Sequence, residues 1–236
     1  MSFYLGITLE SHSILVSDRR RHVYSESPSH EDDSPKIWRI RDDLFLTAAG
    51  LLYLAEGFLL EALPQVVKDS PLDMNLLVPK LPEWARTFDR EYKEMDRNVT
   101  AQLESKGLDP SIQREQVTSV LLGGVDGKGV PFLLGFYSFE EFKPHLQHGT
   151  FRRSVLPLFS EDGDVKKSEQ LTKWVNNAVV KRLKLLAAMP KESDRVKRAV
   201  KNMPEVVRLV AAKDQGVSPE YDLVVIGRTS CQTYSG

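Results

Sequence analysis

The sequence predicts an α+β fold, a four-layer αββα sandwich in which two antiparallel sheets lie between outer layers of helices. Short apolar segments occur in pairs joined by tight polar turns, which is the pattern of antiparallel hairpins. Helical periodicity occurs in blocks between these pairs, whereas a parallel βαβ fold alternates single strands with single helices. The 236 residues contain no internal repeat and no convincing linker, so we expect one domain over residues 1–236.

The first predicted hairpin opens the chain. Residues 3–9 and 13–17 are apolar segments that flank a short polar turn, and the chain begins inside the first strand, so we expect no leader. A polar segment at residues 25–35 contains two prolines and predicts a loop. Residues 36–40 and 44–48 then form the second predicted hairpin.

Helical spacing begins after Gly50. Apolar residues recur at this spacing over residues 51–63, and a second helix is predicted over residues 83–104. Strands return at residues 116–125 and at Pro131–Tyr137, joined by a glycine-rich turn. The rest of the chain is predicted to be mainly helical until a buried strand closes it; these elements are a helix over residues 166–188, one or two helices over residues 190–212, and the strand over residues 221–228.

Composition excludes several classes of protein. The 32 Lys and Arg residues balance 33 Asp and Glu residues, so no overall basic charge indicates a nucleic-acid or membrane partner. A single cysteine, Cys231, excludes an intramolecular disulfide and fits a reducing compartment. No apolar run approaches the roughly 20 residues that span a bilayer, and no signal peptide is visible. We therefore expect a soluble, cytoplasmic protein.

The second residue, Ser2, is the strongest candidate for a catalytic nucleophile. If Met1 is removed, as is common before a small residue, Ser2 becomes the N-terminus. Ser2 then carries both a hydroxyl nucleophile and an α-amine whose pKa lies near ~7.7–8.0, so the amine can act as a base at neutral pH. N-terminal nucleophile hydrolases depend on this pairing.

Local sequence matches to one family follow in the same order as the predicted elements. Residues 4–20 resemble the start of mature proteasome β-type subunits and of their bacterial HslV and Anbu relatives. Aligned on Gly6-Ile7-Thr8-Leu9, the N-terminal threonine of that family falls on Ser2 and an aspartate on Asp18. Further segments that match the family follow in order: Lys36-Ile37-Trp38-Arg39-Ile40, Ala48-Ala49-Gly50, Gly123-Gly124-Val125-Asp126 and Tyr221-Asp222-Leu223-Val224-Val225-Ile226. Counting back from the Tyr221–Ile226 segment places Asp214 on an aspartate of the family.

The resemblance implies an N-terminal nucleophile (Ntn) hydrolase that acts as a threonine- or serine-type endopeptidase. Its nucleophile would be Ser2, with Lys36 as a positive charge beside it and Asp18 as the partner of Lys36. The Gly50 amide would donate to the oxyanion. Asp214 and a nearby hydroxyl, Ser218, would orient the α-amine. This chemistry requires neither a metal nor an organic cofactor.

The family also implies partners and leaves alternatives open. A homo-oligomeric ring would enclose the nucleophile, unfolded proteins would be the substrates, and an ATP-dependent unfoldase could deliver them. This sequence departs from the family pattern because a Gly-Ser-Gly-Ser-Pro turn is replaced by the weaker match His148-Gly149-Thr150, and because the helical region of residues 166–212 is longer. The alternatives are an inactive ring or scaffold subunit, and an Ntn amidase or transpeptidase with one dedicated substrate.

Other features have simpler interpretations. Asp18 and Lys36 individually also fit ordinary charges at strand ends, and Gly50 also fits a tight turn. The five histidines show no metal-ligand spacing, so structural or exposed roles are expected for them. The stripe of Trp84, Phe88, Tyr92 and Met95 is typical of a helix face that packs in a core.

Overall fold

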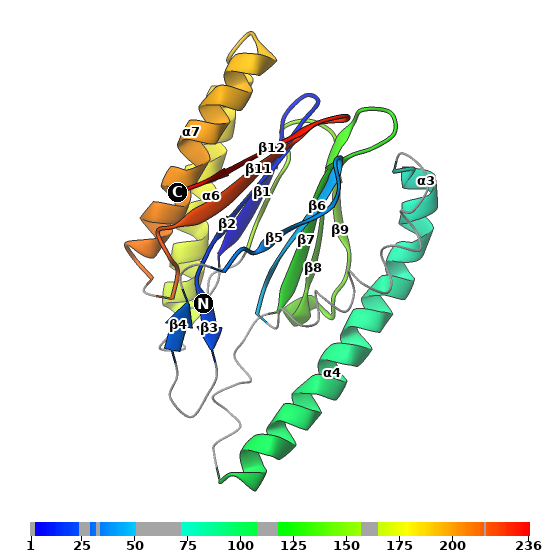
Figure 1. Ribbon diagram of the computed structural model, residues 1–236, viewed down its shortest axis with the longest axis vertical. Coiled ribbons are helices and arrows are strands. Elements are labelled where there is room, and N and C mark those ends of the chain that lie inside the picture. The colour runs from blue at the N-terminus through cyan, green and yellow to red at the C-terminus, as the bar shows by residue number, and fades with distance from the viewer. Residues whose placement is uncertain are drawn as a thin grey trace.

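The described part of the chain forms a mixed α+β structure with two antiparallel five-stranded sheets and three long helices (Figure 1). This computed structural model describes residues 3–23, 29–31, 34–50, 72–107, 118–156, 165–214 and 216–236. The predicted α+β class is confirmed. Within the described ranges, no helix combines the length and the apolar character needed to cross a membrane.

The first sheet has the strand order β10-β1-β2-β11-β12. Its centre is the predicted opening hairpin, β1 (Tyr4–Thr8) and β2 (Ser13–Asp18), in which Tyr4 pairs with Ser17 and every residue is buried. Strand β11 (Tyr221–Ile226) lies antiparallel to β2, so the end of the chain pairs with its beginning. The edges are β10 (Arg153–Val155) beside β1 and β12 (Cys231–Ser235) beside β11.

The second sheet has the strand order β5-β6-β7-β8-β9. Strands β5 (Ile37–Arg41) and β6 (Leu44–Ala49) are the second predicted hairpin. They are followed in the sheet by β7 (Ser119–Val125), β8 (Pro131–Tyr137) and β9 (His145–His148). Every residue of β6, β7 and β8 is buried, which explains their continuous apolar sequences.

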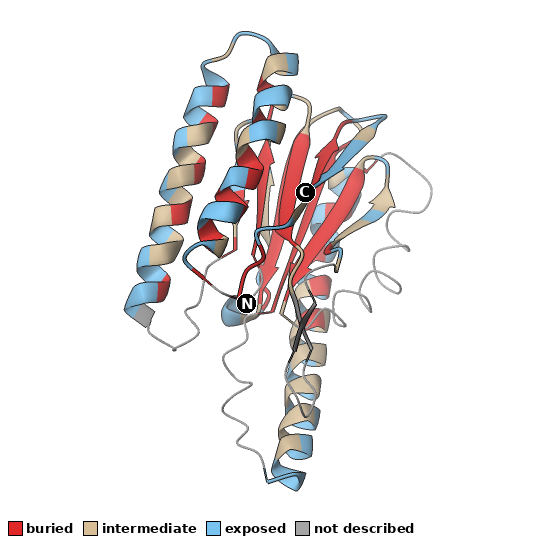
Figure 2. Cartoon of the chain, turned by 60° about the vertical axis from the view of Figure 1, so that its left-hand side comes forward, coloured by how far each residue is buried: buried red, intermediate tan, exposed pale blue. Residues whose placement is uncertain are grey.

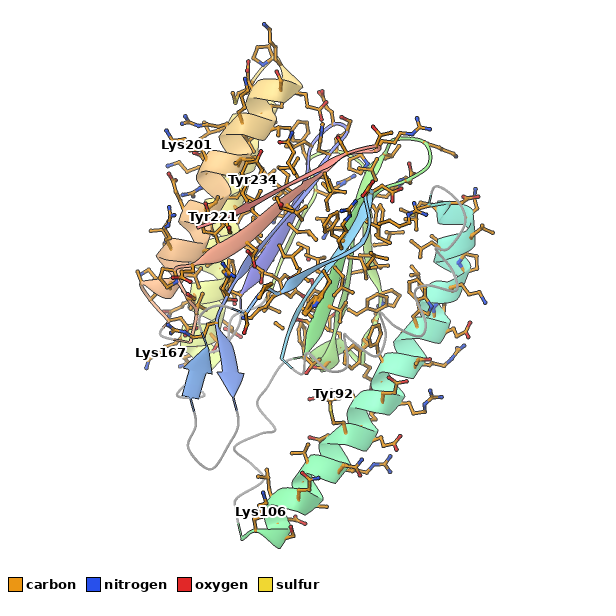
Figure 3. All side chains as sticks on the ribbon, viewed as in Figure 1. Tyr92, Lys106, Lys167, Lys201, Tyr221 and Tyr234 are labelled. Atoms are coloured by element: carbon orange, nitrogen blue, oxygen red, sulfur yellow. The ribbon has the colours of Figure 1, made fainter. Side chains whose placement is uncertain are left out.

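The outer faces of the two sheets are covered by different helices (Figures 1 and 2). Helices α6 (Val165–Ala187) and α7 (Glu192–Ala211) pack on the first sheet, and only their inward sides are buried. A short helix α3 (Met74–Leu77) and the turn η1 (Val78–Lys80) lead into α4 (Leu81–Ser105), which packs on the second sheet through residues that include Trp84 and Phe88. Farther along α4, Tyr92 and Met95 are only half-buried, so the predicted core stripe is fully buried over its first part alone.

The inner faces of the two sheets share one buried cluster. It includes Tyr4 and Leu15 from the first sheet and Leu121 and Leu133 from the second. Gly6 allows the close approach, because a Cβ atom there would lie 2.8 Å from Cδ2 of Leu133. The two sheets therefore pack directly against each other.

Several predicted boundaries are wrong. The predicted loop at residues 25–35 contains β4 (Ser29–Glu31), which pairs with β3 (Arg21–Val23) in a separate two-stranded sheet. Strands β9 and β10 lie in the stretch predicted to be mainly helical, and β12 follows the strand predicted to be last. Four of these five strands are only three or four residues long, and most of their residues are polar, so they carry little of the apolar alternation that predicts a strand.

Two predictions about helices have different outcomes. The stretch predicted to hold one or two helices, residues 190–212, contains one helix, α7 (Glu192–Ala211), which has Pro204 in its interior. The helix predicted over residues 51–63 lies outside the described residues.

Candidate functional site

The best candidate for a functional site is centred on the carboxylate of Asp18. Asp18 is the last residue of β2 and is completely buried. Its Oδ1 atom accepts hydrogen bonds from the Phe3 amide at 2.7 Å and from Lys36 Nζ at 3.0 Å. Its Oδ2 atom accepts one from the Arg20 amide at 3.1 Å and a longer, weaker one from the Ser218 amide at 3.4 Å. These four hydrogen-bond donors fix the position of the Asp18 carboxylate.

Lys36 brings a positive charge to this carboxylate. It immediately precedes β5 and is completely buried, like Asp18. Removing an ammonium group from water costs several kcal/mol unless an opposite charge and further hydrogen bonds compensate for it. The 3.0 Å contact with Asp18 supplies that compensation. The predicted pairing of Lys36 with Asp18 is therefore present in the structure.

The loop between α7 and β11 brings two more predicted residues to the same end of the sheets. Asp214 follows the end of α7, where its amide donates to the carbonyl of Val210 at 2.9 Å. Its Oδ1 atom accepts from the Gly216 amide at 2.8 Å, which forms a tight turn. The turn places the fully buried Ser218 with its amide toward Asp18. The fold therefore joins Ser218 to the Asp18 group directly, and Asp214 lies four residues before Ser218 in the same loop.

Gly50 lies at the same end of the structure. It directly follows β6, and its φ angle of 80° lies in the left-handed region that favours glycine. In the β5–β6 hairpin Ile37 pairs with Thr47, so Lys36 and Gly50 lie toward the same end of this sheet. The conformation explains why a glycine is needed here.

Ser2, the predicted nucleophile, lies outside the described residues. Its neighbour Phe3 is described and completely buried. The Phe3 amide and Lys36 Nζ donate to the same oxygen of Asp18, so the Phe3 nitrogen lies beside the buried ion pair. The Phe3 carbonyl also accepts from the Asp18 amide at 3.0 Å, which fixes Phe3 on both sides.

The sequence interpretation missed the backbone donors of this site. The amides of Phe3 and Arg20 hold the Asp18 carboxylate as directly as Lys36 does. No residue type marks such donors, because every residue except proline carries the same N–H group. The contact between the Arg20 amide and the Asp18 carboxylate becomes visible only when the backbone is placed.

The histidines have separate roles. His12 contacts Glu192, His148 Nε2 lies 2.9 Å from Asp126 Oδ2, and His145 contacts Glu140. Each of the three thus has one carboxylate partner, and none of them joins the Asp18 group. In the described part of the chain, no group of three or more His, Cys, Asp or Glu side chains is arranged to hold a metal ion.

Comparisons with known proteins do not assign this arrangement to a family. No protein-family model matches the chain, and a search of the curated proteins finds no significant match. Functional conclusions therefore depend on the resemblance in the sequence and on the geometry around Asp18.

Proposed function

We propose that the protein is an N-terminal nucleophile peptidase of the proteasome type that hydrolyses peptide bonds in unfolded proteins. The observation that supports this most is the buried Lys36–Asp18 ion pair, whose Asp18 oxygen also binds the amide of Phe3. The pair thus carries a fixed positive charge to the residue that follows Ser2. A buried ion pair contributes little to stability by itself, so its presence favours a role in chemistry.

The proposed reaction begins after removal of Met1. The Ser2 α-amine, directly or through water, takes the proton from Oγ as Oγ attacks the peptide carbonyl. Lys36 stabilises the developing alkoxide, and the Gly50 amide donates to the oxyanion, an interaction typically worth about 2.7–4 kcal/mol of barrier. The protonated amine then gives its proton to the leaving amine, which departs and leaves an ester on Ser2. Water attacks the ester with the α-amine as base again, releasing the acid and restoring Ser2.

The finer architecture is part of the same proposal. The two sheets pack face to face, with α6 and α7 on one outer side and α4 on the other. This order of layers supports the αββα sandwich of the Ntn hydrolases. We infer in addition a cytoplasmic homo-oligomeric ring that could receive substrates from an ATP-dependent unfoldase.

The intact mass of the native protein tests the chemistry first. We expect a mass lower by one methionine residue, and hydrolysis of fluorogenic peptides that is lost in Ser2→Ala and retained in Ser2→Thr. Thr carries the same hydroxyl and α-amine, so it is the matched control. Retention of Met1 would block the α-amine and refute the mechanism. Native mass spectrometry of the same sample measures the size of any ring.

Two alternative functions predict different results. An inactive ring or scaffold subunit predicts that Ser2→Ala changes no measurable property. The replacement of the Gly-Ser-Gly-Ser-Pro turn in the sequence favours this alternative. An Ntn amidase with a dedicated substrate predicts turnover of one small amide and no cleavage of unfolded chains.

A further inference from the structure

A polar pocket of about 300 Å³ lies where the edges of both sheets meet α6, and no residue of the Asp18 group lines it. Three strands and one helix line it, since Tyr137 ends β8, His145 and Gln147 belong to β9, Arg153 and Ser154 belong to β10, and Asn176 belongs to α6. Val155 completes the lining. This volume is at the lower end of the range for small-molecule sites, so the pocket suits a ligand of about amino-acid size.

The pocket contains two buried hydroxyl groups, and their mutual hydrogen bond leaves one O–H hydrogen unused. Tyr137 Oη and Ser154 Oγ lie 2.7 Å apart, and both side chains are buried. Two hydroxyl groups carry two hydrogens, and their mutual bond uses only one of them. Burial raises the pKa of Tyr137 above its usual value, so the phenol keeps its proton at neutral pH. One O–H donor is therefore available to a ligand.

Arg153 supplies a positive charge at the pocket. Its side chain is exposed, and no acidic side chain among the described residues forms an ion pair with it. No Asp or Glu residue lines the pocket, and His145 already contacts Glu140. The neighbouring helical layer adds to the positive potential, because residues 165–214 contain thirteen Lys and Arg residues and only five Asp and Glu residues.

The remaining polar groups indicate the rest of the ligand. The Gln147 side-chain oxygen accepts from the Arg153 amide, which leaves the Gln147 NH₂ group as a donor. The Asn176 NH₂ group donates to the carbonyl of Thr172, which leaves the Asn176 oxygen as an acceptor. The pocket therefore offers one guanidinium, neutral donors and one amide acceptor. One guanidinium with no carboxylate partner among the described residues matches a monoanionic carboxylate, whereas a phosphate dianion would remain only half neutralised.

We propose that this pocket binds a carboxylate that lies next to an amide N–H, as found in an N-acylated amino acid or at the carboxyl end of a peptide. Arg153 and the free hydroxyl hydrogen bind the carboxylate, and the Asn176 oxygen accepts from the amide N–H. This inference does not depend on the reaction proposed for Ser2.

Saturation-transfer NMR with N-acetylglycine as the probe tests the pocket, because this method observes the ligand and works for any oligomer. We expect saturable binding to the full-length protein and to Ser2→Ala alike. Arg153→Gln should weaken it roughly tenfold or more, since hydrogen bonds to charged groups are lost. Arg152→Gln is the matched control. It removes the same charge from the adjacent residue, which is exposed but outside the pocket, and should change affinity by less than about twofold.

Two further probes define the ligand. N-acetylglycinamide, which lacks the carboxylate, should not compete, and a short acetylated peptide with a free carboxyl end shows whether peptide ends enter as well as small molecules. The double variant Tyr137→Phe/Ser154→Ala should weaken binding, because it removes both hydroxyls, whereas either single hydroxyl would keep a free hydrogen. Equal binding of the amide probe, equal loss in Arg152→Gln and Arg153→Gln, or tighter competition by inorganic phosphate would each overturn the assignment.

Discussion

The buried ion pair allows a quantitative test of the site. Lys36 Nζ and Asp18 Oδ1 lie 3.0 Å apart with both side chains fully buried. At an effective dielectric constant of about 20, two unit charges at this distance attract by about 5–6 kcal/mol. Desolvation offsets most of this attraction, but removal of one partner leaves the other charge buried without its opposite charge. Such single substitutions typically destabilise a protein by about 3–5 kcal/mol.

The two single variants should lose different amounts of unfolding free energy. Lys36→Met leaves the Asp18 carboxylate with its three backbone donors, so we expect a loss of about 3 kcal/mol in unfolding free energy. Asp18→Asn is expected to be worse, at about 4–5 kcal/mol, because it leaves the ammonium of Lys36 without its carboxylate. Its side-chain NH₂ group can also face the amides of Arg20 and Ser218, which are donors themselves.

The double variant Asp18→Asn/Lys36→Met should be less destabilised than the sum of the single variants by about 2–3 kcal/mol, because neither charge is then left alone. Chemical denaturation followed by circular dichroism measures all three free energies. Strictly additive effects, or single effects below about 1 kcal/mol, would show that the two charges are not coupled and that the site does not hold a fixed ion pair.

Three further predictions concern stability. Hydrogen bonds from His12 and Ser11 outweigh burial and lower the pKa of Glu192, so its stabilisation is present above the normal pKa and is lost as the pH falls through the folded value. Glu192→Gln should therefore flatten the acid side of the stability profile below about pH 4.5, as measured by urea unfolding at several pH values. Gly124→Ala should lower the melting temperature with a loss of about 1–3 kcal/mol, because the new Cβ would lie 2.6 Å from the backbone oxygen of Asp43; an unchanged melting temperature would refute this contact. Thr47→Val should stabilise the protein by about 1 kcal/mol, because the buried Thr47 hydroxyl has no hydrogen-bond partner among the described residues, and a destabilised variant would indicate a bound water there.

The parts of the fold that the sequence predicts are those in which burial leaves a pattern. Strand β2 and strand β8 are buried over their whole length, and their apolar runs mark them clearly. Strand β12 has the opposite character, since four of its five residues are exposed. It exists because β11 offers a free edge of backbone donors and acceptors, from Asp222 to Ile226, and any side chain can pair along such an edge.

For the candidate site, as for the fold, the sequence predicts the side chains that take part but not the backbone groups. Asp18 and Lys36 could be named because the resemblance placed them, and the structure brings them to hydrogen-bonding distance although they are 18 residues apart. The Phe3 amide could not be named, because its role depends on the register of β1 and β2 and on no property of a phenylalanine side chain. Sequence patterns thus identify charged groups, whereas backbone geometry determines which donors surround them.

Buried polar groups are concentrated at one end of the paired sheets. Asp18, Lys36 and Ser218 meet there, and the buried hydroxyls of Thr47 and Ser119 lie near the same ends of β6 and β7. The Thr47 hydroxyl has no partner within the described ranges, and an unpaired buried hydroxyl costs about 1–3 kcal/mol. At the opposite end of β7, the side chain of Asp126 satisfies the turn by accepting two backbone hydrogen bonds. A chain selected for stability alone would replace the unpaired Thr47 hydroxyl with an apolar group, so its retention at the end that holds the ion pair favours a function there.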